Sequence, residues 1–288
     1  MLQISVVIPA YNEMDSLEQV ILGLKKEIGS LGLEHEIIVV NDGSTDRTKD
    51  ILGKIEGIRL INHPENKGYG ASLKTGAKNA KYEWLLFFDA DGQHRPEYIK
   101  EFLRYADQYD MIVGARQGYQ GPQWRQTGKT LIRLTANYLA GKKIPDLNCG
   151  FRLLKKEHFL RYEHLFPNKF SLSTTSTLAF LKEGLSVKYV PIEINKRIGK
   201  SSLKISDGIS AVILVVRLTM LFSPLKIFLP ISFAGFVISG TMIFYYLIKT
   251  HFETISKSGG YLFITALLIF LFGLMADQIA AIRREIKK

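Results

Sequence analysis

Two aspartates separated by one residue, Asp89 and Asp91, are the side chains of this sequence best suited to binding a divalent cation. They follow an apolar run at residues 84–88, which predicts a strand that ends just before them. In an extended segment, positions i and i+2 point the same way, so both carboxylates would face one ligand. Mg²⁺ and Mn²⁺ prefer such oxygen ligands, often one or two carboxylates together with phosphate oxygens. Gln93 would add a carbonyl oxygen.

Two further polar clusters follow predicted strands in the same way. One cluster, at residues 11–13, comes after an apolar run at residues 4–10, and another, at residues 41–44, comes after a run at residues 36–40. Taken singly, each cluster is typical of a turn and a helix cap. Ligands of parallel sheets bind beyond the carboxyl ends of the strands, so three such clusters at one edge favour a ligand site.

The elements that would position these clusters alternate along the first half of the chain. Short apolar runs predict strands at residues 4–10, 36–40, 58–62, 84–88 and 111–113. Helical spacing alternates with them at residues 13–29, 45–56 and about 70–80, and a further helix is expected to open near Pro96. This alternation predicts an α/β domain with βαβ units and a parallel sheet covered on both faces.

The last third of the chain changes character. Residues 227–248 carry no formal charge, and the apolar stretch at residues 261–276 continues past Asp277 to residue 282. Each stretch approaches the ~20 residues that a helix needs to cross a bilayer. We therefore predict a transmembrane hairpin with spans at about residues 227–248 and 260–282, in preference to a pair of buried core helices.

The charge pattern places this hairpin in a membrane. The formal net charge is +11, but the basic residues are dispersed and several flank the apolar third, which favours an anionic membrane surface over nucleic acid as the partner. The tail at residues 283–288 is basic, and the positive-inside rule puts it and the N-terminal domain in the cytoplasm. The single cysteine, Cys149, fits a reducing compartment.

Three parts are therefore expected: a domain at residues 1–205, a juxtamembrane region at residues 206–226, and the hairpin with its tail at residues 227–288. The apolar segment at residues 207–222 contains Arg217. It fits either an amphipathic helix lying in the membrane interface or a helix packed on the soluble domain. The expected location is the cell (cytoplasmic) membrane, with the N-terminal domain on the cytoplasmic side.

Several motifs together resemble a known family. Four of them are similar to the inverting glycosyltransferases of family two, which have the GT-A fold: Val7-Ile8-Pro9-Ala10-Tyr11-Asn12-Glu13, Asn41-Asp42-Gly43-Ser44-Thr45-Asp46, Asn66-Lys67-Gly68 and Asp89-Ala90-Asp91-Gly92-Gln93. Three more resemble the branch of dolichol-phosphate mannose synthase and bacterial polyprenyl-phosphate glycosyltransferases: Gly114-Ala115-Arg116, Asp146-Leu147-Asn148-Cys149-Gly150-Phe151-Arg152 and Arg197-Ile198-Gly199-Lys200-Ser201. The similarity covers about residues 3–205.

The resemblance implies a GT-A (Rossmann-like), mostly parallel sheet, followed by interfacial helices and a membrane hairpin, and it implies roles for individual residues. Those expected to bind the nucleotide are Pro9, Tyr11, Glu13, Asp42, Lys67 and Ala90, with Asp42 at the base and Arg197 and Lys200 closing over the phosphates. Those expected to hold Mg²⁺ or Mn²⁺ and the donor diphosphate are Asp89, Asp91 and Gln93. Arg116 and Arg125 would meet the acceptor phosphate, since arginine's planar fork suits phosphate oxygens.

Asp146 matches an aspartate discussed in this family as a catalytic base. A phosphomonoester has a second pKa of about 6, so the acceptor is already mostly a dianionic nucleophile at neutral pH. Asp146 would alternatively orient Arg116 or Arg152, or cap a turn after Pro145. The family often has an acidic residue within the segment at residues 170–177, where this chain has only hydroxyl groups, so the resemblance does not identify the sugar.

The predicted activity is transfer of a sugar from a UDP- or GDP-sugar to a polyprenyl (undecaprenyl or dolichyl) phosphate, with inversion at the anomeric carbon. A processive polysaccharide synthase of the same fold is one alternative, but Gln123-Trp124-Arg125 does not match the Gln-x-x-Arg-Trp motif of those enzymes. A non-catalytic nucleotide-sugar-binding membrane scaffold is another, and the intact Asp-x-Asp and the arginines argue against it. The expected partners are the donor, the lipid phosphate and the bilayer, with a homo-oligomer left open.

Overall fold

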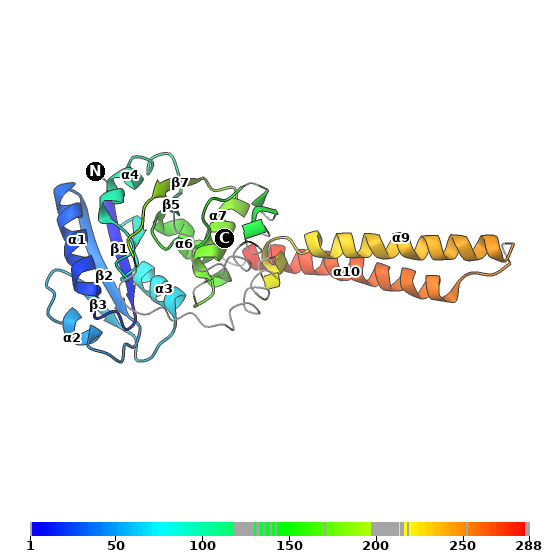
Figure 1. Ribbon diagram of the computed structural model, residues 1–288, viewed down its shortest axis with the longest axis horizontal. Coiled ribbons are helices and arrows are strands. Elements are labelled where there is room, and N and C mark those ends of the chain that lie inside the picture. The colour runs from blue at the N-terminus through cyan, green and yellow to red at the C-terminus, as the bar shows by residue number, and fades with distance from the viewer. Residues whose placement is uncertain are drawn as a thin grey trace. The chain divides into compact units, whose positions relative to one another are not determined.

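The structure is a computed structural model that describes residues 2–117, 130, 133–134, 136–138, 140–141, 143–169, 171–196, 213, 216–217, 219–251 and 253–285. It divides into two compact units, residues 1–211 and 212–288. The first unit is built around a seven-stranded sheet, and the second contains two long helices (Figure 1).

The sheet of the first unit has the strand order β3-β2-β1-β4-β6-β5-β7. Its strands are β1 (Gln3–Ala10), β2 (Glu34–Asn41), β3 (Arg59–Asn62), β4 (Trp84–Phe87), β5 (Met111–Arg116), β6 (Arg152–Lys155) and β7 (Val187–Ile192). All neighbouring pairs are parallel except those of β6, which runs antiparallel to β4 and β5. The central strands are buried on both faces, which is why they are near-continuous apolar runs.

Helices lie on both sides of this sheet, and Figure 1 shows α1 (Leu17–Ser30) and α3 (Tyr69–Asn79) on opposite sides of β1 and β2. Gly76 lets α3 approach β1, because a Cβ there would overlap the side chain of Val7. The remaining helical elements of the unit are α2 (Thr48–Leu52), η1 (Pro96–Tyr98), α4 (Ile99–Leu103), α6 (Lys156–Tyr162), η2 (Glu163–Leu165) and α7 (Leu172–Lys182).

The register brings the predicted polar clusters to one edge. Ala10 at the end of β1 pairs with Asn41 at the end of β2, and Val7 pairs with Phe87 at the end of β4. The segments that follow these three adjacent parallel strands therefore leave the sheet on the same side. This confirms the placement expected from the order of apolar runs and polar clusters.

Two strands were not predicted, and their sequences explain why. β6 begins with Arg152, a charged residue that is fully buried, and β7 contains Lys188 and Pro191. Proline is tolerated in β7 because this strand lies at the edge of the sheet. The helix expected at residues 45–56 is also shorter, with α2 spanning only Thr48–Leu52.

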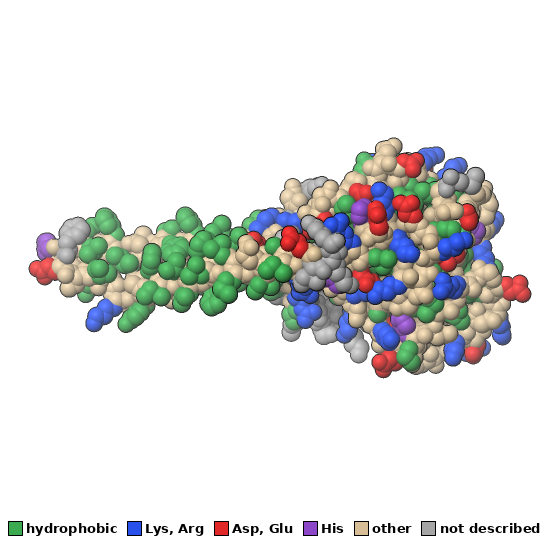
Figure 2. Space-filling view, turned by 180° about the vertical axis from the view of Figure 1, so that it is seen from behind, with side chains coloured by type: hydrophobic (Ala, Val, Ile, Leu, Met, Phe, Trp, Pro, Cys, Tyr) green, Lys and Arg blue, Asp and Glu red, His purple; other side chains and the backbone are tan. Residues whose placement is uncertain are grey.

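The second unit contains α9 (Leu225–Lys249) and α10 (Lys257–Glu285), which include the two predicted spans. Small residues bring these helices close together: a Cβ on Gly235 would lie 2.8 Å from the Cβ of Ala266. Both helices are long and apolar enough to cross a membrane, and only 11% and 17% of their apolar windows are buried. They are therefore not core helices of this structure, and hydrophobic side chains cover the visible face of the hairpin in Figure 2.

Candidate active site

The carboxylate of Asp89 lies just beyond β4 and accepts hydrogen bonds on both oxygens. Its Oδ1 accepts from the Tyr69 hydroxyl at 2.8 Å, and its Oδ2 accepts from Nε2 of His94 at 3.2 Å. Gly150 faces it, where a Cβ would overlap the carboxylate. Burial alone would raise the pKa of Asp89, but the hydrogen bond and charge of His94, the hydrogen bond from Tyr69 and the charge of Arg116 hold it below its usual value. Asp89 is thus kept ionised.

Asp91 and Gln93 form the turn that follows. Oδ1 of Asp91 accepts a hydrogen bond from the backbone N–H of Gln93 at 3.1 Å, and Gly92 between them has a φ of 72°, which glycine adopts readily. Both side chains are half-buried. Asp91 and Gln93, two of the predicted metal ligands, therefore lie in one hydrogen-bonded turn that begins two residues after Asp89.

The donor set of this turn fits Mg²⁺ or Mn²⁺ bound together with a ligand. Among the described residues, no three His, Cys, Asp or Glu side chains come together as a metal-binding group. An all-protein cage of such side chains is therefore not formed by that part of the chain. Two carboxylates and an amide oxygen, completed by phosphate oxygens, are the incomplete kind of set that these ions use in phosphate-binding sites.

The turns after β1 and β2, where the nucleotide is predicted to bind, are joined by hydrogen bonds. The backbone N–H of Thr45 donates to Oδ1 of Asn12 at 2.8 Å, and the backbone N–H of Glu13 donates to Oγ1 of Thr48 at 3.0 Å. Asn12 has a positive φ of 55°. Tyr11 is 42% exposed, which leaves its ring accessible to a ligand, whereas Pro9 is buried within β1.

A buried serine joins this region to the turn at residues 89–93, which carries the predicted metal ligands and is called the metal turn below. Oγ of Ser16, the residue before α1, donates to the backbone oxygen of Ala90 at 2.7 Å. Ala90, which was predicted to contact the nucleotide, is therefore fixed against the start of α1.

Asp42 has an organising role that was not predicted. Its Oδ1 lies 2.6 Å from Nδ1 of His63 and accepts from the backbone N–H of Lys67 at 3.0 Å, while its Oδ2 accepts from the backbone N–H of Gly68 at 2.8 Å. The side chain is only 4% exposed. Asp42 therefore fixes the turn that carries Lys67 and leads into Tyr69, and its contact with a base remains a prediction.

Arg116, at the end of β5, pairs with Asp146. Nε and Nη2 of the guanidinium donate to the two carboxylate oxygens at 2.7 and 3.0 Å. Burial would raise the pKa of Asp146, but the hydrogen bonds and charge of Arg116 lower it overall. Asp146 also accepts a hydrogen bond from the backbone N–H of Asn148 at 3.0 Å. The structure thus shows two of the alternatives for Asp146 together, the pair with Arg116 and the cap of the turn after Pro145.

Three residues of α7 contact the guanidinium of the buried Arg152. Nη1 of Arg152 donates to Oγ of Ser176 at 3.0 Å and to Oγ1 of Thr177 at 3.3 Å, and also to the backbone oxygen of Ser173. These residues are buried, with at most 3% exposure. The hydroxyl groups of Ser176 and Thr177 thus accept hydrogen bonds from a buried cation.

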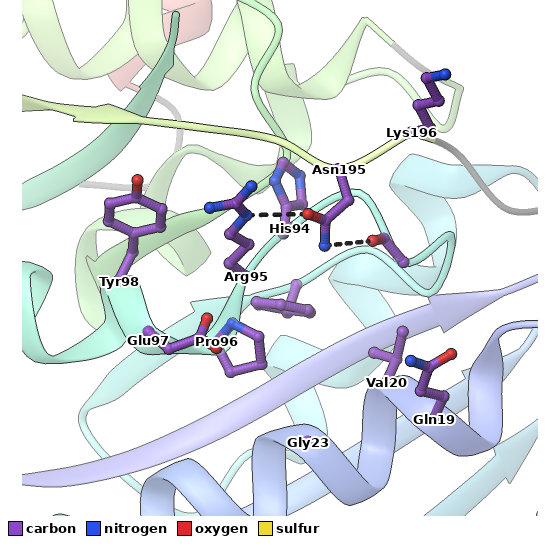
Figure 3. Close-up of a pocket in the computed structure, with 12 residues that line it drawn as sticks. Gln19, Val20, Gly23, His94, Arg95, Pro96, Glu97, Tyr98, Asn195 and Lys196 are labelled. Atoms are coloured by element: carbon purple, nitrogen blue, oxygen red, sulfur yellow. Dashed lines mark hydrogen bonds between the residues drawn. The ribbon is translucent and has the colours of Figure 1, made fainter.

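A cleft of about 690 Å³ lies beside the metal turn (Figure 3). It is lined by α1, by the segment after Asp91, and by Asn195 and Lys196 after β7. Figure 3 shows two hydrogen bonds between Asn195 and the segment after Asp91: its Oδ1 accepts from Nε of Arg95 at 2.9 Å, and its Nδ2 donates to the backbone oxygen of Gly92 at 3.5 Å. The segment that precedes Arg197 is therefore attached to the metal turn.

Three predicted site residues, Arg125, Arg197 and Lys200, lie outside the described residues. Tyr69 and His94, in contrast, contact the site without having been predicted. Each lies next to a motif, after Asn66-Lys67-Gly68 and after Gln93. That adjacency was the available signal, but their contacts with Asp89 depend on the tertiary structure.

Two family descriptions match the chain. Glycosyl transferase family 2 matches residues 5–162, and the GtrB C-terminal hairpin matches residues 223–282. An uncharacterized protein of Methanocaldococcus jannaschii is 31% identical over 202 residues, covering 66% of this chain and 81% of that protein. The undecaprenyl-phosphate 4-deoxy-4-formamido-L-arabinose transferase of Edwardsiella ictaluri is 34% identical over 155 residues, covering 52% of this chain and 48%, about half, of that protein.

Solved structures share the fold. Glucosyl-3-phosphoglycerate synthase from Mycobacterium tuberculosis, in complex with Mn²⁺, UDP and phosphoglyceric acid, has a TM-score of 0.62 and 18% identity, covering 76% of this chain and 78% of that one. Mannosyl-3-phosphoglycerate synthase from Rubrobacter xylanophilus has a TM-score of 0.61 and 19% identity, covering 76% and 72%. The chain belongs to glycosyl transferase family 2, with a GT-A-like sheet domain followed by a GtrB-type hairpin of two apolar helices.

Proposed function

We propose that this family 2 glycosyltransferase moves a sugar from a UDP- or GDP-sugar to a polyprenyl phosphate, with inversion at the anomeric carbon. The observation that carries the proposal is the proximity of opposite charges at one sheet edge. Phe87 of β4 and Val113 of β5 both pair with Arg152 of the antiparallel strand β6 between them. The Asp89–Asp91 turn after β4 and Arg116 at the end of β5, which is paired with Asp146, therefore lie at the same edge. Such a site matches a metal-bound diphosphate on one side and a lipid phosphate on the other.

The donor side is assigned to the segments after β1, β2 and β4. Tyr11, Glu13 and Lys67 border the nucleotide in this proposal, while Asp89 and Asp91 would hold the metal with Gln93. A bound Mg²⁺ or Mn²⁺ supplies positive charge that stabilises the departing diphosphate. Support comes from the donor set of this turn and from the Mn²⁺ and UDP present in the glucosyl-3-phosphoglycerate synthase structure of the same fold.

The acceptor side is assigned to Arg116. An oxygen of the lipid phosphate attacks the anomeric carbon while the bond from that carbon to the nucleoside diphosphate breaks, and the diphosphate leaves with the bonding electrons. The phosphate is already mostly a dianion at neutral pH, so no proton has to be removed. We therefore assign Asp146 to orienting the Arg116 fork, in agreement with its lowered pKa, which makes it a weak proton acceptor.

A lipid acceptor accounts for the hairpin. The two apolar helices would confine the enzyme to the bilayer in which its acceptor diffuses. This would raise the effective concentration of the lipid acceptor at the active site. The Edwardsiella ictaluri relative is named for transfer to undecaprenyl phosphate, which is the same acceptor class. The sheet domain, proposed at residues 1–205, would lie on the cytoplasmic side; the basic residues after the second helix support this through the positive-inside rule.

A panel of radiolabelled nucleotide sugars tests this function. Membranes containing the full chain are incubated with each UDP- or GDP-sugar, Mn²⁺ and polyprenyl phosphate, and label is measured in the organic extract. We expect one donor to give labelled lipid, and Asp91→Ala to abolish labelling while the protein remains in the membrane. Full activity of the Asp91→Ala variant, or no lipid labelling with any donor, would contradict the proposal.

A further inference from the structure

Tyr69 lies between two acidic residues of the site, Asp42 and Asp89. It is the first residue of α3, directly after the turn whose backbone N–H groups donate to Asp42, and its hydroxyl donates to Oδ1 of Asp89 at 2.8 Å. A tyrosine phenol has an ordinary pKa of about 10, so at neutral pH it carries its proton and donates to this carboxylate.

The position of Tyr69 is fixed by its chain neighbours. Gly68 has a φ of 102°, which glycine adopts at little cost, and a Cβ on either Gly68 or Gly70 would overlap the backbone at residues 167–168. The backbone N–H of Ala71 donates to the backbone oxygen of Asn168 at 3.0 Å. The start of α3 is thus held between Asp42 and the backbone at residues 167–168. The backbone that carries the Tyr69 side chain is therefore fixed on both sides.

The second oxygen of Asp89 is held from another element. His94 donates from Nε2 at 3.2 Å, and its ring lies 5.7 Å from that of Phe88 and 5.4 Å from that of Phe151. Its side chain is only 4% exposed. Two side chains from different segments therefore fix both the position and the rotation of one carboxylate.

We propose that Tyr69 is a positioning residue for Asp89, aided by His94, and that it sets the affinity of the site for the metal–diphosphate pair. The inference rests on the proposed function, in which Asp89 takes part in holding that pair. Partners that orient a metal-binding carboxylate typically contribute 10- to 100-fold to metal affinity or activity. Tyr69→Phe keeps the ring and removes the hydroxyl, which donates to Asp89 and also has a hydrogen bond with the Ser173 side chain.

A matched control exists at the other end of the sheet. The hydroxyl of Tyr82 donates to Oε1 of Glu34 at 3.0 Å, and this tyrosine is 7% exposed. Glu34 begins β2 and Tyr82 precedes β4, so the pair lies at the edge opposite the site. Tyr82→Phe therefore removes the same kind of hydrogen bond without touching Asp89.

The test measures Mn²⁺ binding to the full-length protein in detergent. Mn²⁺ is titrated in the presence of UDP and, separately, GDP, and free Mn²⁺ is followed by electron paramagnetic resonance. With the nucleotide that supports binding, we expect Tyr69→Phe to weaken Mn²⁺ affinity about 10- to 100-fold. Tyr82→Phe should stay within about twofold of the unsubstituted protein, because its hydrogen bond is remote from the site. Equal Mn²⁺ affinities for the two variants would overturn the proposal.

His94→Phe provides an independent variant, since it keeps a ring beside Phe88 and Phe151 and removes the other donor. It should weaken Mn²⁺ binding in the same direction, and unchanged binding would contradict the aid assigned to His94. Thermal unfolding of the tyrosine variants checks that both fold. If the unsubstituted protein binds no Mn²⁺ with either nucleotide, the proposed metal-dependent function fails as well. If it binds Mn²⁺ and Tyr69→Phe binds equally well, only the role of Tyr69 fails.

Discussion

Replacing Asp146 with asparagine separates a positioning role from a role as a proton acceptor. The carboxylate accepts four hydrogen bonds: from Nε, Nη2 and the backbone N–H of Arg116, and from the backbone N–H of Asn148. An asparagine has only one acceptor oxygen, so either orientation of its amide leaves two of these donors facing an NH₂ group. The Arg116 fork would then lose its fixed orientation.

The geometry sets the expected size of the effect. Hydrogen bonds to charged groups contribute about 1.5–3 kcal/mol each, and the exposed fractions of the two side chains, 26% for Arg116 and 13% for Asp146, let water replace part of this. We expect a net loss of about 2–3 kcal/mol in the placement of Arg116. If that loss falls on the transition state, kcat/KM for the lipid phosphate decreases about 30- to 150-fold.

The assay is transfer of labelled sugar to polyprenyl phosphate at saturating donor and Mn²⁺, measured across pH 5–9. For a positioning role, Asp146→Asn lowers kcat/KM by a constant factor and keeps the shape of the pH profile. The double variant with Arg116→Ala should be no worse than Arg116→Ala alone, because both changes act through the same guanidinium. A changed profile, or independent additive losses, would refute the positioning role in favour of proton transfer by Asp146.

Three further predictions concern other parts of the molecule. Gly150→Ala pushes a methyl group into the Asp89 carboxylate and should lower the rate of sugar transfer at least about tenfold. Gly76→Ala, whose added methyl group would overlap Val7 of β1, should instead lower the free energy of unfolding in urea by about 1–3 kcal/mol. Asp110 has its pKa lowered to about 2, with burial opposed by hydrogen bonds from Ser186 and Lys155 and by the charge of Lys155. The ionised Asp110 therefore stabilises the folded state by about 2 kcal/mol at a pH above its unfolded pKa of about 4, and this stabilisation is lost as the pH falls through about 2. Asp110→Asn should remove this part of the acid-unfolding curve. A chain ended after residue 206 should still bind the nucleotide in a calorimetric titration, yet turn over the lipid acceptor poorly.

The parts of the fold that were predicted have strong local signals. β1, β2 and β4 are nearly uniform apolar runs because both faces of the sheet are covered, and their order along the chain placed three polar clusters at one edge. β6 carried no such signal because it begins with the buried Arg152. The hydroxyl groups that satisfy this arginine come from α7, more than 20 residues later, so the sequence alone does not connect them.

The sequence alone predicted only some of the residues of the candidate site. Asp89 and Asp91 stand out because their position after a strand has a physical meaning, and Arg116 stands out because its charge suits a phosphate. Tyr69 and His94 were missed since tyrosine and histidine have many structural uses and their contacts with Asp89 arise only when α3 and the loop after β4 come together. The pairing of Asp146 with Arg116 was one of several alternatives until the structure placed them 2.7 Å apart.

One measurement tests the central claim most directly: purified full-length protein is given its labelled nucleotide sugar, Mn²⁺ and either polyprenyl phosphate or the corresponding polyprenol. We expect labelled lipid with the phosphate and none with the alcohol, because in the proposed mechanism Arg116 binds a phosphate whose oxygen needs no proton removed. We also expect Asp91→Ala to give no labelled lipid with either acceptor. Labelled polyprenol, or undiminished transfer by Asp91→Ala, would contradict the account.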